Sequence, residues 1–454
     1  VEFFDALYFH AVVAADAIGE ADVANNGAAA EGPQLANTSR DLAGEALTFA
    51  MPEVIAAGDT AVARIMMTNL GNMPVTGPIA LRAYARTVGD PFLADIPLGE
   101  AVTVNVNLLP GGRLAAVVPV RIDAPLEPGA AYELYIALDD GNAVEETDEA
   151  NEVMLGEARQ YVQRFGAFEG HRNHALVLSD ALDQPVTFTL VGGGYGTVET
   201  DGEGRFEIAL TGTTARSVVR IATAAGQTTA IHTLDADADL GSLLADSADL
   251  TGSMTFAGGV GRIVLRDVAD QHQITIGPSS LTTNLTLGNV ADLSIDTPNP
   301  IVALKVAQWL DSDGDDTIAA PSIASLTSAG AFQANLELSG LNAPRGLALG
   351  TVRIAGGVDD ADNTDTDWTI LEGSIGTVDI AGATDNFALA GTDARLIRLA
   401  DAADASVTLT GALAVLQAGQ WTGGAIEAAS INTLTAAGDF GASMTVAGTL
   451  ANAR

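Results

Sequence analysis

The sequence predicts an all-β fold in which an Ig-like β-sandwich is followed by a β-rich cap and a parallel β-solenoid. Three observations predict it: short alternating strands near the N-terminus, an internal repeat near the C-terminus, and a composition of 49 Gly with 5% aromatic residues. Small residues fit tight solenoid corners better than a bulky globular core. We expect a tether or added strand at 1–44, the sandwich at 45–157, the cap at 158–238 and the solenoid at 239–454.

The internal repeat relates residues 323–340 to residues 431–448. A turn of about 18 to 25 residues is too short to bury its own apolar face, so neighbouring turns must supply the other wall. Strands stacked roughly 4.8 Å apart then align their apolar residues as ladders. The repeated positions are Ile323, Leu326, Gly330, Phe332, Leu336, Leu338 and Gly340 in the first copy, and Ile431, Leu434, Gly438, Phe440, Met444, Val446 and Gly448 in the second.

The region 45–157 alternates apolar and polar residues in short runs that Pro and Gly separate. Six or seven such strands in about a hundred residues are typical of an Ig-like sandwich. The predicted strands are Ala46 to Ala50, Thr60 to Asn69, Ile79 to Thr87, Ala101 to Leu108, Arg113 to Ile122 and Ala131 to Leu138.

Three segments of this region carry a family resemblance: Thr68 to Asn72, Leu126 to Gly129 with Tyr132, and Asp139 to Glu145 with Asn151. Together they resemble the bacterial cell-adhesion-related domain called CARDB, over about a quarter of the chain. The family usually ends in paired asparagines, whereas this chain has Glu152 after Asn151. The resemblance implies an adhesion module.

The region from 158 onward is rich in Gly and predicted strands, and we expect it to cap the unpaired strand edges of the solenoid. Its segments Val186 to Leu190 and Leu210 to Thr214, with Ala320 to Ile323 preceded by Trp309, resemble the large secreted surface proteins of planctomycete-type bacteria. This resemblance spans most of 160–454 and implies a cell-surface or matrix component.

The formal net charge of −38 argues against a nucleic-acid partner, because each phosphate contact would form in a repulsive field. No run reaches the length of a membrane span, so no membrane insertion is expected within this chain. Because the sequence begins at Val1 without an initiator Met, we expect a processed or partial product. The excess acid requires either solvation, as on a soluble acidic surface, or cations.

An acidic insertion gives the first candidate metal site. Aligning Ile318 with Ile426 places Trp309 four residues farther upstream than Trp421, and the extra residues fall within 311–316. Alternating carboxylates around a Gly suit the oxygen coordination of Ca²⁺, while the alternative is a solvated acidic turn. The predicted ligands are Asp311, Asp313, Asp315 and Asp316.

A second acidic cluster precedes Trp368 and is a weaker Ca²⁺ candidate on the same argument. Its predicted ligands are Asp359, Asp360, Asp362 and Asp365. The acidic corner at 139–145 is interpreted as a structural turn, and the pair His171 and His174 as part of a polar loop. We expect the three tryptophans to pack in the core, since each comes before a solenoid turn.

The repeats reproduce core and corner positions without reproducing a catalytic trio, which favours a noncatalytic extracellular structural or adhesive surface protein. Self-association into filaments or a surface layer, supported by Ca²⁺, is expected because sheet edges pair readily. Other surface proteins or glycans are the alternative partners. The rival hypotheses are a β-helix carbohydrate-active enzyme and a glycan-binding module.

Overall fold

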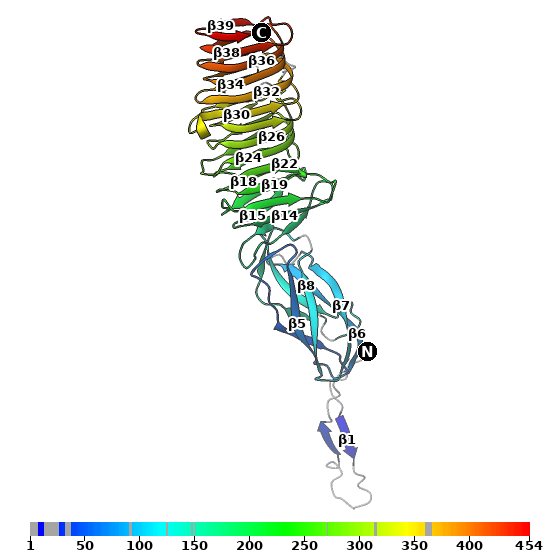
Figure 1. Ribbon diagram of the computed structural model, residues 1–454. Helices are drawn as coiled ribbons and strands as arrows, with labels where there is room; N and C mark the ends of the chain where they lie inside the picture. The colour runs from blue at the N-terminus through cyan, green and yellow to red at the C-terminus, as the bar shows by residue number, and fades with distance from the viewer. Residues whose placement is uncertain are drawn as a thin grey trace, which may run out of the picture. The chain divides into compact units, whose positions relative to one another are not determined.

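The computed structural model contains two compact units, Val1–Val162 and Gln163–Arg454, which are described separately (Figure 1). It describes the backbone of Tyr8–Val12 and Gly27–Glu31, and residues 38–454 with gaps at 90–92, 124–125, 147–148, 150, 270, 313–315 and 359–365. Strands and the 3₁₀ turn η3 (Pro344–Gly346) are the regular elements of the described residues. The predicted all-β class is therefore confirmed. Among these residues no helix has the length and apolarity needed to cross a membrane.

The N-terminal unit contains a two-stranded antiparallel ribbon, β1 (Tyr8–Val12) with β2 (Gly27–Glu31), and a β-sandwich. One sheet of the sandwich has the order β3-β5-β8, and the other has the order β4-β11-β9-β6-β7 with β10 also on β9. The strands are β3 (Leu42–Thr48), β4 (Val54–Ala56), β5 (Thr60–Asn69), β6 (Val75–Thr87), β7 (Ile96–Leu108), β8 (Arg113–Arg121), β9 (Ala131–Leu138), β10 (Glu152–Met154) and β11 (Arg159–Val162).

Buried and exposed side chains alternate along the strands, and this alternation explains why the two sheets pack face to face. In β5, Ala63, Ile65 and Met67 are buried while the residues between them are more exposed, as expected for a strand with one face toward the core. Tyr132 is also buried, and its hydroxyl accepts a hydrogen bond from the backbone N–H of Glu127 at 2.8 Å. The sandwich core is therefore closed by an aromatic ring whose polar end is satisfied.

The C-terminal unit begins with antiparallel pairs and changes to parallel pairing at β18. The antiparallel strands are β12 (Arg164–Gly166), β13 (Leu176–Ser179), β14 (Pro185–Val191), β15 (Tyr195–Thr200), β16 (Phe206–Thr211) and β17 (Val218–Ala222). Strand β16 then pairs in parallel with β18, and β17 with β19. These antiparallel strands therefore close the first turn of the solenoid with hairpin pairing, as expected of a cap.

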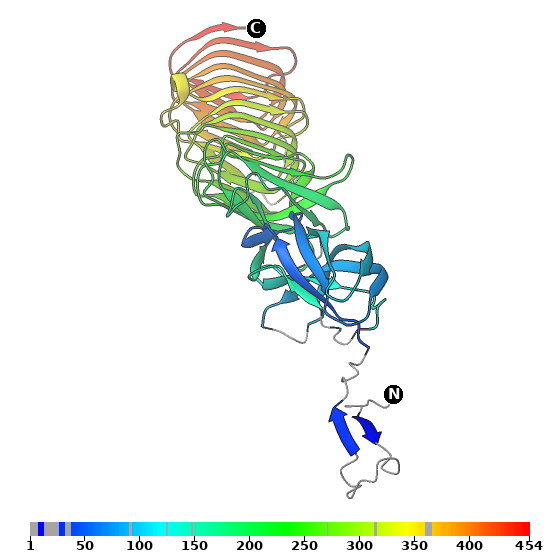
Figure 2. The ribbon, with the colours of Figure 1, turned by 90° about the horizontal axis from the view of Figure 1, so that it is seen from below.

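The solenoid has two sheets, and each turn contributes strands to both (Figure 2). Sheet S1 contains β18 (Thr229–Ala236), β20 (Ala248–Leu250), β21 (Met254–Phe256), β23 (His272–Ile276), β25 (Leu293–Asp296), β27 (Thr317–Ala320), β29 (Asn335–Leu338), β31 (Thr366–Ile370), β33 (Phe387–Gly391), β35 (Ser406–Leu409), β37 (Ala425–Ala428) and β39 (Ser443–Val446). Sheet S2 contains β19 (Ser242–Ala245), β22 (Arg262–Leu265), β24 (Thr283–Ala291), β26 (Ile301–Leu310), β28 (Ile323–Ser328), β30 (Leu347–Ile354), β32 (Ser374–Asp385), β34 (Ala394–Ala403), β36 (Ala412–Thr422), β38 (Ser430–Ala436) and β40 (Leu450–Ala453).

Turn length varies along the stack. Leu416 pairs with Leu434, 18 positions later, whereas Leu326 pairs with Val352, 26 positions later. The longer turn includes η3, which lies between β29 and β30. Insertions at corners thus change the length of a turn without breaking the register of the strands.

Apolar ladders join the turns, as the repeat predicts. In S2, Leu304, Leu326 and Val352 stack in register and are buried. In S1, Trp368 stacks between Leu336 and Leu389 and is completely buried. Trp309 and Trp421 are completely buried as well, so the predicted packing role of the tryptophans is confirmed.

The corner from S2 to S1 uses residues with positive φ. Gln271, Asp292, Asn386 and Asp404 occupy it in different turns, with φ of 43°, 52°, 51° and 48°. This left-handed region is uncommon for residues other than Gly, and Asn and Asp enter it more readily than most. The corner geometry therefore favours short polar side chains, and it places carboxylates where successive turns meet.

Candidate metal centre

Three buried carboxylates from two successive turns meet at this corner. They belong to Asp292, between β24 and β25, and to Asp311 and Asp316, between β26 and β27. One carboxylate oxygen from each lies within 4.8 Å of the others. Their exposed fractions are 8%, 6% and 4%. We call these residues the Asp292/Asp311/Asp316 centre.

The strand register explains why these side chains meet. Ala291 at the end of β24 pairs with Leu310 at the end of β26. Asp292 and Asp311 therefore follow neighbouring positions of adjacent parallel strands, which lie about 4.8 Å apart. The loop after β26 has six residues, whereas the equivalent loop between β36 and β37 has two, Gly423 and Gly424. The predicted insertion is thus confirmed, and it returns Asp316 toward Asp311.

Hydrogen bonds hold each carboxylate in place. The two oxygens of Asp292 accept from the backbone N–H and the hydroxyl of Ser312, both at 2.7 Å. Asp311 Oδ2 accepts from the backbone N–H of Asp316 at 3.1 Å, and Asp316 Oδ2 accepts from Trp309 Nε1 at 3.0 Å. The acids are therefore oriented before any ligand arrives, which is what outer-shell partners do for metal ligands.

A comparison with Trp421 shows what the insertion does for the core. Trp421 occupies the corresponding position on β36, and its indole N–H has no hydrogen-bond partner among the described residues. The indole N–H of Trp309 has Asp316 as its acceptor. The acidic loop therefore satisfies a buried donor as well as gathering negative charge.

The electrostatics of the centre are unfavourable without a counterion. The pKa of Asp316 is raised to about 7, chiefly by burial and also by the nearby charges of Asp311 and Asp292, against the lowering effect of hydrogen bonds from Trp309 and from the backbone of Leu293. Neither Asp292 nor Asp316 forms a salt bridge with a Lys or Arg of the described residues. Either a proton or a cation must therefore offset the buried negative charge.

The donor set suits a hard divalent cation. All three side chains offer oxygen, which is the donor that Ca²⁺ and Mg²⁺ prefer. Asp292 and Asp316 also line a polar hollow of about 600 Å³ together with Gln271, His272 and Ser294. An ion therefore has a path to the centre from the surface.

In the metal-free protein, the raised pKa of Asp316 should make the free energy of unfolding depend on pH. Because this pKa is about 7 when folded and near 4 when unfolded, the stabilisation from the bound proton is complete below about pH 4 and is lost as pH rises through about 7. In chelator, we expect the free energy of unfolding of the solenoid to decrease as pH rises from about 5 to 8. The decrease should be smaller for Asp316→Asn. Urea unfolding across this pH range, followed by Trp fluorescence, measures the difference. Parallel profiles for the two proteins would contradict the raised pKa.

The predicted site residues divide into two groups. Asp311 and Asp316 come together in the centre, whereas Asp313 and Asp315 lie outside the described residues. Asp359, Asp360, Asp362 and Asp365 of the second cluster also lie outside them, so that site stays a prediction. Sequence reasoning missed Asp292. Its spacing of 19 residues from Asp311, one turn length, is the signal that identifies it.

The sequence predicts two other polar segments, the acidic corner at 139–145 and the loop that contains His171 and His174. Asp139 has a φ of 53°, and its Oδ2 accepts from the backbone N–H of Val144 at 2.7 Å, while Asp140 accepts from the hydroxyl of Tyr84. The predicted structural turn is thus confirmed. In the polar loop, the ring of His171 stacks on Phe168 with centroids 4.3 Å apart and meets His174 edge-on at 5.0 Å.

Comparison of the chain with protein-family models and with curated proteins gives no match. Among solved structures, it is similar to the crystal structure of a CARDB domain from Pyrococcus furiosus in complex with di-metal ions, with 21% identity, 29% of this chain and 95% of that chain covered, and a TM-score of 0.20. The solution structure of the same domain is 18% identical, with 27% of this chain and 95% of that chain covered and a TM-score of 0.19. The crystal structure of a β-glucosidase from Listeria innocua in complex with glucose is 10% identical, with 27% of this chain and 16% of that chain covered and a TM-score of 0.18.

The CARDB resemblance expected from Thr68 to Asn151 thus has counterparts among solved structures. The affiliation with planctomycete-type surface proteins stays a prediction. This chain spans about one sixth of the β-glucosidase that it matches.

Proposed function

We propose that this chain is a noncatalytic extracellular protein of the cell surface, structural or adhesive in role, whose solenoid is fastened by Ca²⁺ at the Asp292/Asp311/Asp316 centre. The observation that carries the proposal is the meeting of three buried carboxylates from two successive turns. A cation bound to all three links the turns directly. It replaces electrostatic repulsion with coordination, so folding and ion binding reinforce each other.

Ca²⁺ suits these side chains better than Mg²⁺ does. Ca²⁺ accepts six to eight oxygen ligands in flexible geometry at about 2.3 to 2.6 Å, whereas Mg²⁺ requires near-ideal octahedral geometry at about 2.1 Å. The three carboxylates belong to short side chains whose directions are fixed by hydrogen bonds to Ser312, Asp316 and Trp309. Ca²⁺ tolerates such a ligand set, and waters from the hollow can complete it.

A structural role accounts for the orientation of the acids better than catalysis does. Asp316 is tied to the core through Trp309, and both oxygens of Asp292 are bound to Ser312. A general acid or base must instead reach a substrate proton. Incubation with neutral and acidic polysaccharides should therefore give no cleavage. Turnover that Asp316→Asn abolishes would establish the enzyme alternative and contradict the proposal.

We expect the chain to associate with copies of itself. The exposed edge strand β7 of the sandwich is a candidate surface for this association. Strand β7 pairs with β6 on one side and has no strand partner on the other among the described residues. An edge of this length is a template for pairing with another chain. We expect light scattering in Ca²⁺ to show species larger than a monomer. A monodisperse monomer both in Ca²⁺ and in chelator would contradict assembly.

A further inference from the structure

The basic residues of 301–453 gather on one side of the solenoid. They are Lys305, Arg345, Arg353, Arg395 and Arg398, and each lies on S2 or in the η3 turn that leads into it. The S1 strands over the same length, β27 to β39, contain Glu337, Asp367 and Glu427 and no Lys or Arg. The S2 strands over the same residues also contain Asp379, Asp385 and Asp401, and Asp379 pairs with Arg398. In a chain with a net charge of −38, the basic side chains of this part of the solenoid are thus confined to one side, which is where an anion would meet them.

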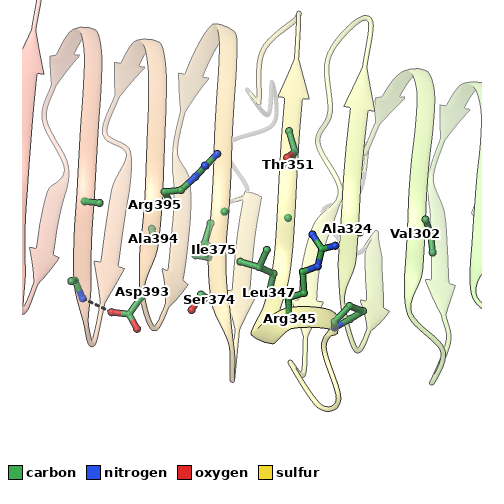
Figure 3. A pocket seen from close by; sticks show the side chains of 15 residues that line it. Val302, Ala324, Arg345, Leu347, Thr351, Ser374, Ile375, Asp393, Ala394 and Arg395 are labelled. Carbon is green, nitrogen blue, oxygen red and sulfur yellow. Dashed lines mark hydrogen bonds between the residues drawn. The ribbon is translucent and has the colours of Figure 1, made fainter.

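A groove of about 860 Å³ lies on this face, across strands β26 to β36. This volume falls in the range of known ligand sites. Its floor consists of small residues, including Ala324, Gly350, Gly376 and Ala394. Figure 3 shows Arg345 and Arg395 extending over the sheet at either side of Leu347 and Ile375. The small residues leave the space, and the two arginines border it. We call it the Arg345/Arg395 groove.

The two guanidinium groups border the groove and have no carboxylate partner among the described residues. Arg345 lies in η3 with φ 59° and ψ 19°, a left-handed conformation that costs free energy for a residue other than Gly. Arg395 Nη2 donates to Thr377 Oγ1 at 2.8 Å. Neither arginine forms a salt bridge within the described residues. The acid that lines the groove, Asp393, accepts from the backbone N–H of Ala412 at 2.6 Å. Both cations therefore remain available to an external anion.

We propose that the Arg345/Arg395 groove binds an acidic polysaccharide. Arg is suited to this because its planar fork can bind a carboxylate through two parallel hydrogen bonds. Thr351 and Ser374 add hydroxyl groups beside the apolar floor, and sugar hydroxyls can pair with them. An acidic peptide is disfavoured, since β28, β30, β32 and β34 are paired on both sides and offer no backbone edge to a peptide strand.

The test is a calorimetric titration of the whole chain with oligogalacturonate and with a sulfated oligosaccharide, in chelator so that Ca²⁺ plays no part. We expect binding of at least one of these probes and none of a neutral glucose oligomer of equal length. Arg345→Gln and Arg395→Gln should each weaken binding by about tenfold, as expected when a charge-assisted hydrogen bond is lost. Arg262→Gln, the same change at an exposed residue of β22 outside the groove, should change affinity less than about twofold.

Two results would overturn this proposal. One is the absence of binding for both acidic probes. The other is equal loss in the Arg262→Gln control, or equally tight binding of polyglutamate, because either would reduce the effect to general attraction of anions. The Ca²⁺ centre shares no residue with the groove, so failure here leaves the proposed function standing.

Discussion

Replacing Trp368 with Ala is expected to lower the free energy of unfolding of the solenoid by about 3 to 5 kcal/mol, the usual cost of removing a large buried aromatic. Trp368 is completely buried in the S1 ladder, and it meets Phe332 and Phe387 edge-on with centroids 6.1 and 5.0 Å away. Its indole N–H donates to the carbonyl oxygen of Ala334 at 3.2 Å. The substitution therefore leaves both a cavity and an unpaired carbonyl in the stack.

Urea unfolding followed by Trp fluorescence measures this effect in the solenoid alone, because all three tryptophans lie in S1 or S2. Leu371→Ala is the matched control. Leu371 directly follows β31 and is 68% exposed, so its truncation should cost less than about 0.5 kcal/mol. Equal losses for Trp368→Ala and Leu371→Ala would show that the ladders do not carry the stability of the stack.

The double variant Asp292→Asn/Asp311→Asn is expected to lose the stabilisation that Ca²⁺ gives to the solenoid. A site on the folded state stabilises it by about 2.7 kcal/mol when the ligand is at a hundred times its dissociation constant. Asn keeps the size and one oxygen of each ligand but removes two of the three charges. We therefore expect wild-type unfolding to shift to higher urea in Ca²⁺, and the variant to unfold at the same urea concentration with Ca²⁺ and with chelator.

The double variant Glu337→Gln/Glu427→Gln controls for net charge. Both residues are exposed on S1, so the control removes the same charge from solvated positions. It should keep the full shift in Ca²⁺. If the control lost the shift as well, the cation would be acting on the acidic surface as a whole, and the centre would have no special role.

The fold could be predicted from the sequence wherever residue types repeat. The equivalence of Ile318 with Ile426 placed both residues in one S1 ladder, and the structure stacks them there. The flattened two-sheet section was not predictable, because apolar alternation fixes which side chains face inward and leaves the number of sheets per turn open. The expected turn length of about 18 to 25 residues falls just short of the 26-residue turns, because a corner insertion such as η3 lengthens a turn without adding an apolar period.

The candidate site was predictable in part for a related reason. The acidic loop was visible in the alignment of Trp309 with Trp421, so Asp311 and Asp316 were expected at a corner. Asp292 was not expected there, because its recognition requires the register between β26 and β24 of the preceding turn. The groove was missed as well. Arg345 and Arg395 are 50 residues apart in sequence, and parallel stacking brings them to the same face.

Ca²⁺ binding at the Asp292/Asp311/Asp316 centre is tested by a calorimetric titration of the purified whole chain with Ca²⁺, repeated on Asp292→Asn/Asp311→Asn. We expect saturable binding to the wild type that the variant loses, and binding that weakens as pH falls below about 7, where protons compete for Asp316. Wild-type protein that takes up no Ca²⁺, or a variant that binds it as tightly as the wild type does, would contradict a solenoid fastened by Ca²⁺ at the Asp292/Asp311/Asp316 centre.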